Sequence, residues 1–296
     1  MKGNPAVAQL VLDAQAELAE GPSWDPECGE LAWVDILAGH LHRWDTSTGI
    51  DHCLPLGEPV GAIARRADSG FVAALGSGFA VVDDDGAITR LGDTTIGRPG
   101  MRMNDGKCDS AGRFWAGSMA YTLTPHAGAL YRLDTSRRAL PVFQGLTLSN
   151  GLGWSPDDTL MYLVDSQRPG GPTLTVFDFD AARGEIDHAR VLLRFPDDGA
   201  VPDGLAIDAE GCLWIAMFGG GEVRRYTPAG RLDRTVAVPA SQPTCCTFGG
   251  PDLTDLYITT ARIGLTPEQL AGQPHAGGIF CAPSTVSGLP ANRYHG

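Results

Sequence analysis

A short unit of two apolar runs joined by a turn recurs six times along this chain. Its clearest copy runs from Val201 to Ala216, where Leu205-Ala206-Ile207 leads into the turn Asp208 to Gly211 and a second apolar run around Trp214. Asp and Gly tolerate tight turns, so each unit predicts a β-hairpin. The second strands of the six units are anchored, at spacings of 39, 43, 47, 52 and 43 residues, by Trp33, Val72, Trp115, Tyr162, Trp214 and Tyr257.

Strand-rich repeats of this length are typical of a β-propeller with about four strands per blade. We therefore predict an all-β fold, a six-bladed β-propeller around a central channel, formed by a single domain over residues 1–296. The strand candidate Gln9–Leu12 is expected to close the last blade, after a frayed start at residues 1–8. Thr266, followed by Pro267 and Glu268, predicts a short helical turn inserted in the last blade.

The net charge and the cysteines limit the partners and the cellular compartment that we expect for this protein. The formal net charge is −13, from 22 basic and 35 acidic residues, which argues against nucleic acid and anionic membranes as partners. Seven cysteines without a C-x-x-C pair indicate reduced thiols, and Cys245-Cys246 is expected to pack within a strand. Residues 1–18 do not resemble a signal peptide, and no apolar run is long enough for a bilayer. We expect a cytoplasmic protein, a monomer or a weak homo-oligomer.

Three of the hairpin units begin with an oxygen-bearing side chain directly before glycine: Glu20, Asn150 and Asp203. Loops at the same position of every blade converge on one end of the channel, so these side chains should meet there. Two carboxylates and an amide oxygen form a hard ligand set for one divalent cation, suited to Ca²⁺, Mg²⁺ or Mn²⁺, with Zn²⁺ or Fe²⁺ possible. Two other units carry Val60, and Thr244 or Cys245, at this position, so the fold itself does not demand a ligand there.

The run from Arg102 to Lys107 places a cation and an amide in the loop of another unit. Arg102 has a planar fork of donors that suits an anionic or hydroxyl-rich ligand, and Asn104 lies two residues away. Asp105 and Lys107 are expected to pair with neighbours instead of facing the site. Asp208 and Asp157 are expected to serve as ordinary turn residues, and the seven histidines show no metal-ligand spacing.

The motifs of these loops, taken together, resemble the gluconolactonase and regucalcin (senescence marker protein) family. The resemblance spans about residues 9 to 283 and rests on Glu20-Gly21-Pro22, Arg102 to Gly106, Ser149-Asn150-Gly151, Pro202-Asp203-Gly204 and Phe248 to Leu253. The ending from Thr260-Ala261-Arg262 through Gly277-Gly278-Ile279-Phe280 resembles bacterial sugar lactonases of that family. It implies a six-bladed propeller with one divalent cation on Glu20, Asn150 and Asp203, and substrate contacts from Arg102 and Asn104. One departure concerns specificity, because Tyr121-Thr122 stands where some members carry acidic residues that touch sugar hydroxyls.

The function predicted on this basis is metal-dependent hydrolysis of a sugar (aldono) lactone to its aldonic acid. The cation would act as a Lewis acid on the lactone carbonyl, and a water would attack the carbonyl carbon. Asp203 would accept the proton of that water, and Arg102 and Asn104 would orient the sugar. Two alternatives stay open: a phosphotriesterase-like hydrolase, and a non-enzymatic Ca²⁺-binding regulator or scaffold.

Overall fold

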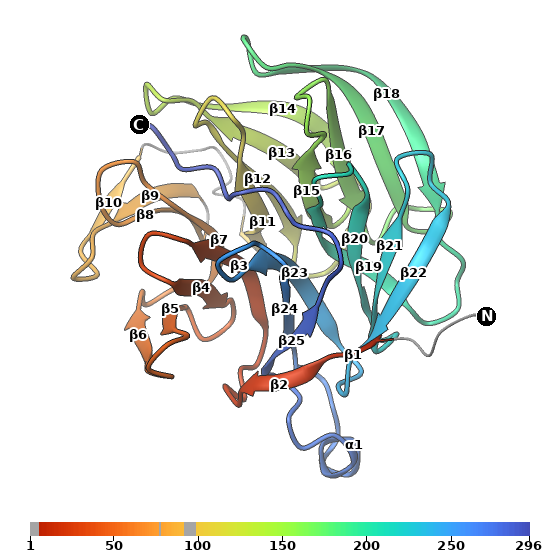
Figure 1. The fold of residues 1–296 in the computed structure, drawn as a ribbon. Coiled ribbons are helices and arrows are strands. Elements are labelled where there is room, and N and C mark those ends of the chain that lie inside the picture. The colour runs from red at the N-terminus through yellow and green to blue at the C-terminus, as the bar shows by residue number, and fades with distance from the viewer. Residues whose placement is uncertain (1–5, 77, 92–98) are drawn as a thin grey trace.

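The computed structural model describes residues 6–76, 78–91 and 99–296, and its strands form six sheets arranged around a common centre (Figure 1). The innermost strands of neighbouring sheets contact one another in a closed circle. The six-bladed β-propeller predicted from the hairpin repeat is therefore confirmed, and each of the six anchor residues lies on the second strand of its blade.

Each blade begins with its innermost strand. Blades 1 to 3 consist of β3 (Ala19–Asp25), β4 (Glu30–Asp35), β5 (His40–Asp45) and β6 (Asp51–Pro55); β7 (Val60–Arg65), β8 (Phe71–Leu75), β9 (Gly78–Val82) and β10 (Ile88–Arg90); and β11 (Met101–Cys108), β12 (Phe114–Ala120), β13 (Gly128–Leu133) and β14 (Ala139–Leu146). Blades 4 to 6 consist of β15 (Ser149–Trp154), β16 (Leu160–Asp165), β17 (Thr173–Asp180) and β18 (Glu185–Arg194); β19 (Val201–Ile207), β20 (Leu213–Phe218), β21 (Glu222–Tyr226) and β22 (Leu232–Ala237); and β23 (Pro243–Gly249), β24 (Asp255–Thr260) and β25 (Ile279–Pro283).

The N-terminal segment joins two blades. Strand β2 (Gln9–Leu12) pairs antiparallel with β25 and completes blade 6, as predicted. The expectation of a frayed start is wrong for residues 6–8, while residues 1–5 lie outside the described part of the chain. Strand β1 (Ala6–Val7) pairs parallel with β22 of blade 5. Ala8 is buried in the apolar cluster between blades 5 and 6. Because β1 pairs with the outer strand of blade 5 and β2 pairs with blade 6, the N-terminal segment links the two blades.

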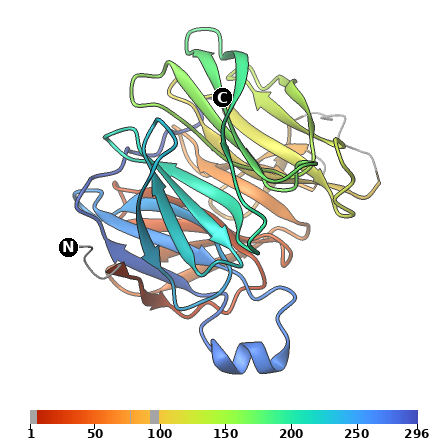
Figure 2. The ribbon, with the colours of Figure 1, turned by 90° about the vertical axis from the view of Figure 1, so that its right-hand side faces the viewer.

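The predicted helical turn is also confirmed. Helix α1 (Pro267–Gly272) lies between β24 and β25 and projects from one end of the molecule (Figure 2). Thr266 caps it, and Gln269 completes a capping box with the Thr266 backbone. Among the described residues, no helix combines the length and the apolar character that crossing a membrane requires. All seven cysteines lie within the described ranges and are free thiols.

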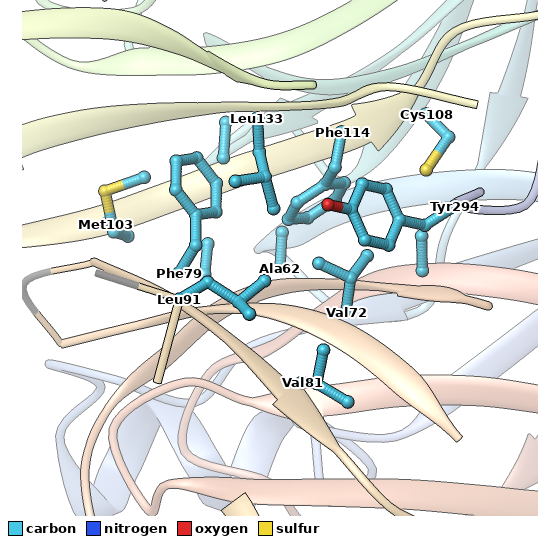
Figure 3. Packing of buried hydrophobic residues seen from close by; sticks show 13 residues of the cluster. Ala62, Val72, Phe79, Val81, Leu91, Met103, Cys108, Phe114, Leu133 and Tyr294 are labelled. Carbon is cyan, nitrogen blue, oxygen red and sulfur yellow. The ribbon is translucent and has the colours of Figure 1, made fainter. Parts of the chain in front are cut away.

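Apolar side chains fill the space between neighbouring blades. Figure 3 shows the cluster between blades 2 and 3, where Phe79 meets Phe114 edge to face at 5.8 Å between ring centroids. Such aromatic pairs stabilise a core beyond the area that they bury. Tyr294 lies in the same cluster with none of its surface exposed, although only two residues follow it in the sequence.

The turn residues of two hairpins have a structural role. Asp208 accepts backbone hydrogen bonds from Glu210 and Cys212, which confirms it as a turn residue. Its other oxygen accepts from Trp214 Nε1 at 2.8 Å and from Arg225, and Asp208 is fully buried. Asp109 in blade 3 likewise accepts from Trp115 Nε1 at 2.8 Å. The geometry that these two turns share fixes the indole of the second strand against the turn that precedes it.

The C-terminal tail after β25 crosses one end of the channel (Figure 1). Gly288 bridges to Asp208 of blade 5, Arg293 pairs with Asp25 of blade 1, and Tyr294 hydrogen-bonds with both blade 2 and blade 3. The sequence did not indicate this path. The tail therefore touches blades that lie on different sides of the ring.

Candidate metal and substrate site

The predicted site residues lie at a bulge that recurs at the same point in all six innermost strands. The pairing register shifts between Glu20 and Ser23 in β3, and at the corresponding place in the other five blades. Asn104, Asn150 and Asp203 fall inside these bulges. A bulge adds an unpaired residue and re-aims its side chain. The repeat thus turns a polar side chain out of the blade at these three places, and Glu20 borders the bulge of β3.

Glycines beside the predicted ligands let the inner strands approach each other closely. A Cβ on Gly151 would lie 2.6 Å from the Asp203 carbonyl oxygen, and one on Gly204 would lie 2.6 Å from Cys245 Cβ. No side chain fits into such gaps, so both positions require glycine. The Asn150 and Asp203 strands are therefore held nearly backbone to backbone, which brings their side chains together.

A chain of hydrogen bonds connects the substrate candidates to a ligand candidate. Arg102 Nη1 donates to Asn104 Oδ1 at 2.6 Å, and Asn104 Nδ2 donates to Asn150 Oδ1 at 3.1 Å. Glu20, Arg102, Asn104, Asn150 and Asp203 are all buried, with 4–8% of their surface exposed. The structure thus brings together Arg102, Asn104 and Asn150 from blades 3 and 4.

Ser166, which the sequence did not single out, fixes the orientation of Asn150. The Ser166 hydroxyl donates to the Pro202 carbonyl at 2.7 Å, so its oxygen is left to accept a hydrogen bond. Asn150 Nδ2 donates to that oxygen at 3.0 Å. The amide oxygen of Asn150 is then directed away from Ser166, and it has a second lone pair besides the one that accepts from Asn104. Ser166 directly follows β16 and belongs to no motif, so only the inter-blade contact reveals it.

Burial and neighbouring negative charge raise the pKa values of both carboxylates of the site. Burial, followed by the charges of Asp203 and Asp105, raises the pKa of Glu20 well above its usual range. Burial and the charge of Asp105 likewise raise the pKa of Asp203, while hydrogen bonding by Asn150 and the charge of Arg102 act in the opposite direction. A buried pair of acids with a neighbouring amide oxygen fits a hard divalent cation, because the cation removes the repulsion. Glu20, Asn150 and Asp203 could hold such a cation.

Asp105 and Lys107 pair with neighbours and also face the channel. Lys107 Nζ donates to the Leu205 carbonyl at 2.8 Å, and Asp105 accepts from the Gly106 amide at 2.7 Å. Both line a cavity of about 290 Å³ that none of the five predicted site residues lines. The cavity runs along the later halves of the innermost strands and is lined at its far end by the tail residues 289–292. The five site residues lie toward the starts of those strands, so the channel has two chemically different sections.

Tyr121 lies beside Arg102. The guanidinium carbon of Arg102 is 5.8 Å from the centre of the Tyr121 ring, and half of the Tyr121 surface is exposed. Burial lowers the pKa of Arg102, and the nearby Tyr121, Glu20 and Asp203 raise it. An aromatic ring thus stands beside Arg102 where an acidic residue occurs in some members of the family that the sequence resembles.

The expectation that the histidines do not cluster is wrong for one pair. His40, His42 and Cys53 bring one potential metal-ligating atom each to within 4.8 Å of one another in blade 1. His40 and His42 are two residues apart, and Cys53 joins them only through the pairing of β5 with β6. The sequence contains no C-x-x-C or H-x-x-x-H pattern that would have indicated this arrangement.

Fold and site together define the class: a six-bladed propeller with a buried, oxygen-rich ring at one end of its channel. The family model described as "SMP-30/Gluconolactonase/LRE-like region" matches residues 18–262, and the chain belongs to this family. Regucalcin of Oryctolagus cuniculus is 36% identical, with 97% of this chain and 98% of that protein covered. The Bacillus subtilis protein YvrE, named as a sugar lactone lactonase, is 34% identical, with 95% of this chain and 96% of that protein covered.

A solved structure of the family has the same fold throughout. Regucalcin from Agrobacterium tumefaciens, described as a calcium-binding protein, superimposes with a TM-score of 0.93. It is 29% identical, and the match covers 98% of each chain. The family predicted from the loop motifs is therefore confirmed.

Proposed function

We propose that this protein hydrolyses a sugar lactone to the corresponding aldonic acid with the help of one divalent cation. The observation that carries the proposal is the buried pair of carboxylates, Glu20 and Asp203, beside the oriented amide of Asn150. The family and the name of the relative YvrE support a lactone as the substrate.

Glu20, Asn150 and Asp203 would hold the cation through two carboxylates and one amide oxygen. A bound divalent cation supplies Lewis-acid polarisation of the lactone carbonyl and stabilises negative charge on its oxygen. The Ser166 hydrogen bond to Asn150 keeps the amide oxygen in place, so that the site needs little rearrangement on loading. Preorganised ligands of this kind strengthen metal binding.

Asp203 is the proposed proton acceptor. Water adds its oxygen to the lactone carbonyl carbon, Asp203 takes the proton that this water loses, and the ring C–O bond then breaks. The proton can return from Asp203 to the ring oxygen, which leaves as the hydroxyl of the product. The low exposure of Asp203 keeps bulk water from competing for this proton.

Arg102 and Asn104 are the proposed substrate contacts. The Arg102 fork can donate to hydroxyl oxygens of the sugar, and its bond to Asn104 Oδ1 holds the guanidinium in one position. Tyr121 stands beside Arg102 in place of an acid, so we infer that this protein accepts a different set of hydroxyl patterns from members that carry the acid. Lactones of different ring stereochemistry, compared by kcat/KM in the wild type and in Tyr121→Glu, test this inference.

The metal assignment is tested by calorimetry on the metal-stripped protein. Glu20→Ala, Asn150→Ala and Asp203→Ala should each weaken binding of Ca²⁺ or Zn²⁺, because each removes one oxygen ligand. Asp157→Asn, a change at an exposed turn, is the control and should bind like the wild type. Unchanged affinity in all three variants contradicts the site. A pH-stat assay with a panel of sugar lactones and a phosphotriester then tests the reaction, and turnover of the phosphotriester alone would favour the phosphotriesterase-like alternative.

The second candidate function is calcium binding without turnover. It is favoured by the Agrobacterium tumefaciens relative, which is described as a calcium-binding protein. Tight Ca²⁺ binding that depends on Glu20 and Asp203, combined with no acid release from any lactone in the panel, would support this function over the lactonase.

A further inference from the structure

His40, His42 and Cys53 form a cluster on β5 and β6, the two outer strands of blade 1, whereas the predicted channel residues lie on innermost strands (Figure 1). Cys53 is the direct cross-strand partner of His42, so the two side chains share one face of the sheet. His40 is two residues before His42 on the same strand and therefore projects from that face as well. One potential ligand atom from each residue lies within 4.8 Å of the other two.

The ring of His42 is held in the form that a metal ligand requires. Asp51 Oδ2 lies 2.7 Å from His42 Nδ1, and the ring stacks on Trp33 with 3.8 Å between centroids. A carboxylate accepts a hydrogen bond, so Nδ1 carries a proton and Nε2 is the atom available to a metal. A histidine that donates its other N–H to a carboxylate is the usual arrangement around protein-bound zinc.

The electrostatic surroundings favour a cation. The carboxylates of Asp51 and Asp35 place negative charge near the Cys53 thiol. The same negative potential attracts a divalent cation, and Cys53 is exposed enough for the ion to enter from solvent. The thiol would bind as thiolate and release its proton to the buffer.

We propose that His40, His42 and Cys53 form a second metal site, selective for zinc and chemically distinct from the oxygen ligands of the channel. Two imidazoles and one thiolate are ligands that zinc prefers, and a water would complete a tetrahedron. Tetrahedral zinc holds nitrogen and sulfur ligands about 3.3–3.6 Å apart, given bond lengths of about 2.0–2.3 Å. Small side-chain rotations therefore suffice to close the site, which would bind the edge strand β6 to β5.

Cobalt distinguishes this site from the channel, because only a thiolate ligand gives a sulfur-to-cobalt charge-transfer band in the near ultraviolet. We expect the full-length, reduced wild-type protein to develop this band on addition of Co²⁺ and to lose it when Zn²⁺ is added. Cys53→Ser should abolish the band, and His42→Gln should weaken Co²⁺ binding. Asp51→Asn, which removes the charge of the carboxylate that accepts from His42, should lower the affinity roughly 10–100-fold.

Matched controls separate the site from other thiols, histidines and metals. Cys28→Ser removes another exposed thiol, His52→Gln changes the histidine next to Cys53, and Asp203→Ala removes a channel ligand. All three should keep the band at wild-type intensity, with circular dichroism used to check the fold. A wild-type protein that shows no charge-transfer band, or a band that persists in Cys53→Ser, overturns the proposal.

Discussion

At the residue scale, we propose that Asp203 acts both as a cation ligand and as the proton acceptor. One substitution separates these two roles. Asparagine keeps a carbonyl oxygen for the cation but cannot accept a proton. Asp203→Asn should therefore retain cation binding at reduced affinity, while kcat at saturating cation falls by roughly 10²–10⁴ and KM changes little. The loss should narrow as pH rises, because hydroxide opens lactones without a base. A metal-saturated variant with near wild-type kcat would show that Asp203 is a ligand only.

The raised pKa values of Glu20 and Asp203 make the stability of the metal-free protein depend on pH. Both acids are protonated in folded and unfolded chains below about pH 4, so they have no effect there. As pH rises above that value, the unfolded chain ionises first and the folded chain is penalised. In chelator, the free energy of unfolding should fall with pH in this window, and Asp203→Asn should reduce the fall.

Asp157→Asn provides a control of opposite sign for this measurement. Hydrogen bonds from Ser155 and Thr159 lower the pKa of the exposed Asp157 carboxylate. Its ionised form therefore stabilises the folded chain above the unfolded pKa, and the substitution should lower stability at neutral pH. Denaturant unfolding at a series of pH values measures both variants, and equal pH profiles for Asp203→Asn and wild type would contradict the electrostatic account.

At the scale of secondary-structure elements, the hairpin turns of blades 3 and 5 each bind the indole of the second strand, and Asp208 tests what this contributes. Asp208→Ala removes the acceptor of Trp214 Nε1 and leaves the buried Arg225 with one carboxylate fewer. Breaking a buried ion pair from one side costs about 3–5 kcal/mol. Glu210→Ala removes an exposed partner of the same Arg225 and should cost about 1 kcal/mol or less. Urea unfolding should separate the two variants, and equal losses would argue against a special role for the turn.

The element scale also explains why the site could be predicted in part. A hairpin is a local structure, and glycine after a polar residue at its entrance recurs at the same place in several units. The bulge that re-aims Asn150 and Asp203, and that begins directly after Glu20, leaves no such pattern, because it depends on the pairing with the second strand. The expected ligand residues could therefore be named from the sequence, but not their orientation.

At the scale of the whole molecule, closure of the ring depends on chain ends as well as blades. Tyr294 lies between blades 2 and 3 and donates from its hydroxyl to the Asp134 carbonyl at 2.9 Å. Tyr294→Ala should destabilise the protein by about 3–5 kcal/mol through loss of buried area and a cavity. Tyr294→Phe keeps the ring and should cost only about 0.5–1.5 kcal/mol. Thermal unfolding of both variants measures this, and a small effect of the alanine would mean that the tail contributes little.

The sequence by itself determined the number of blades, the anchors of their second strands, the closure by Gln9–Leu12 and the glycine-flanked candidates of the site. These features are local, since a hairpin needs only its own residues and a turn between them. The helical turn at Pro267 was predictable for the same reason: its cap and its first turn are contiguous in the chain.

Only the tertiary structure decided which side chains meet across blades. Ser166 orients Asn150 by way of the Pro202 carbonyl, Asp105 turns toward the channel, and the C-terminal tail crosses its end. His40, His42 and Cys53 meet because β5 and β6 pair in one register, and a shift by one residue would place Cys53 on the other face. Such contacts depend on strand register and ring closure, which no short stretch of sequence specifies.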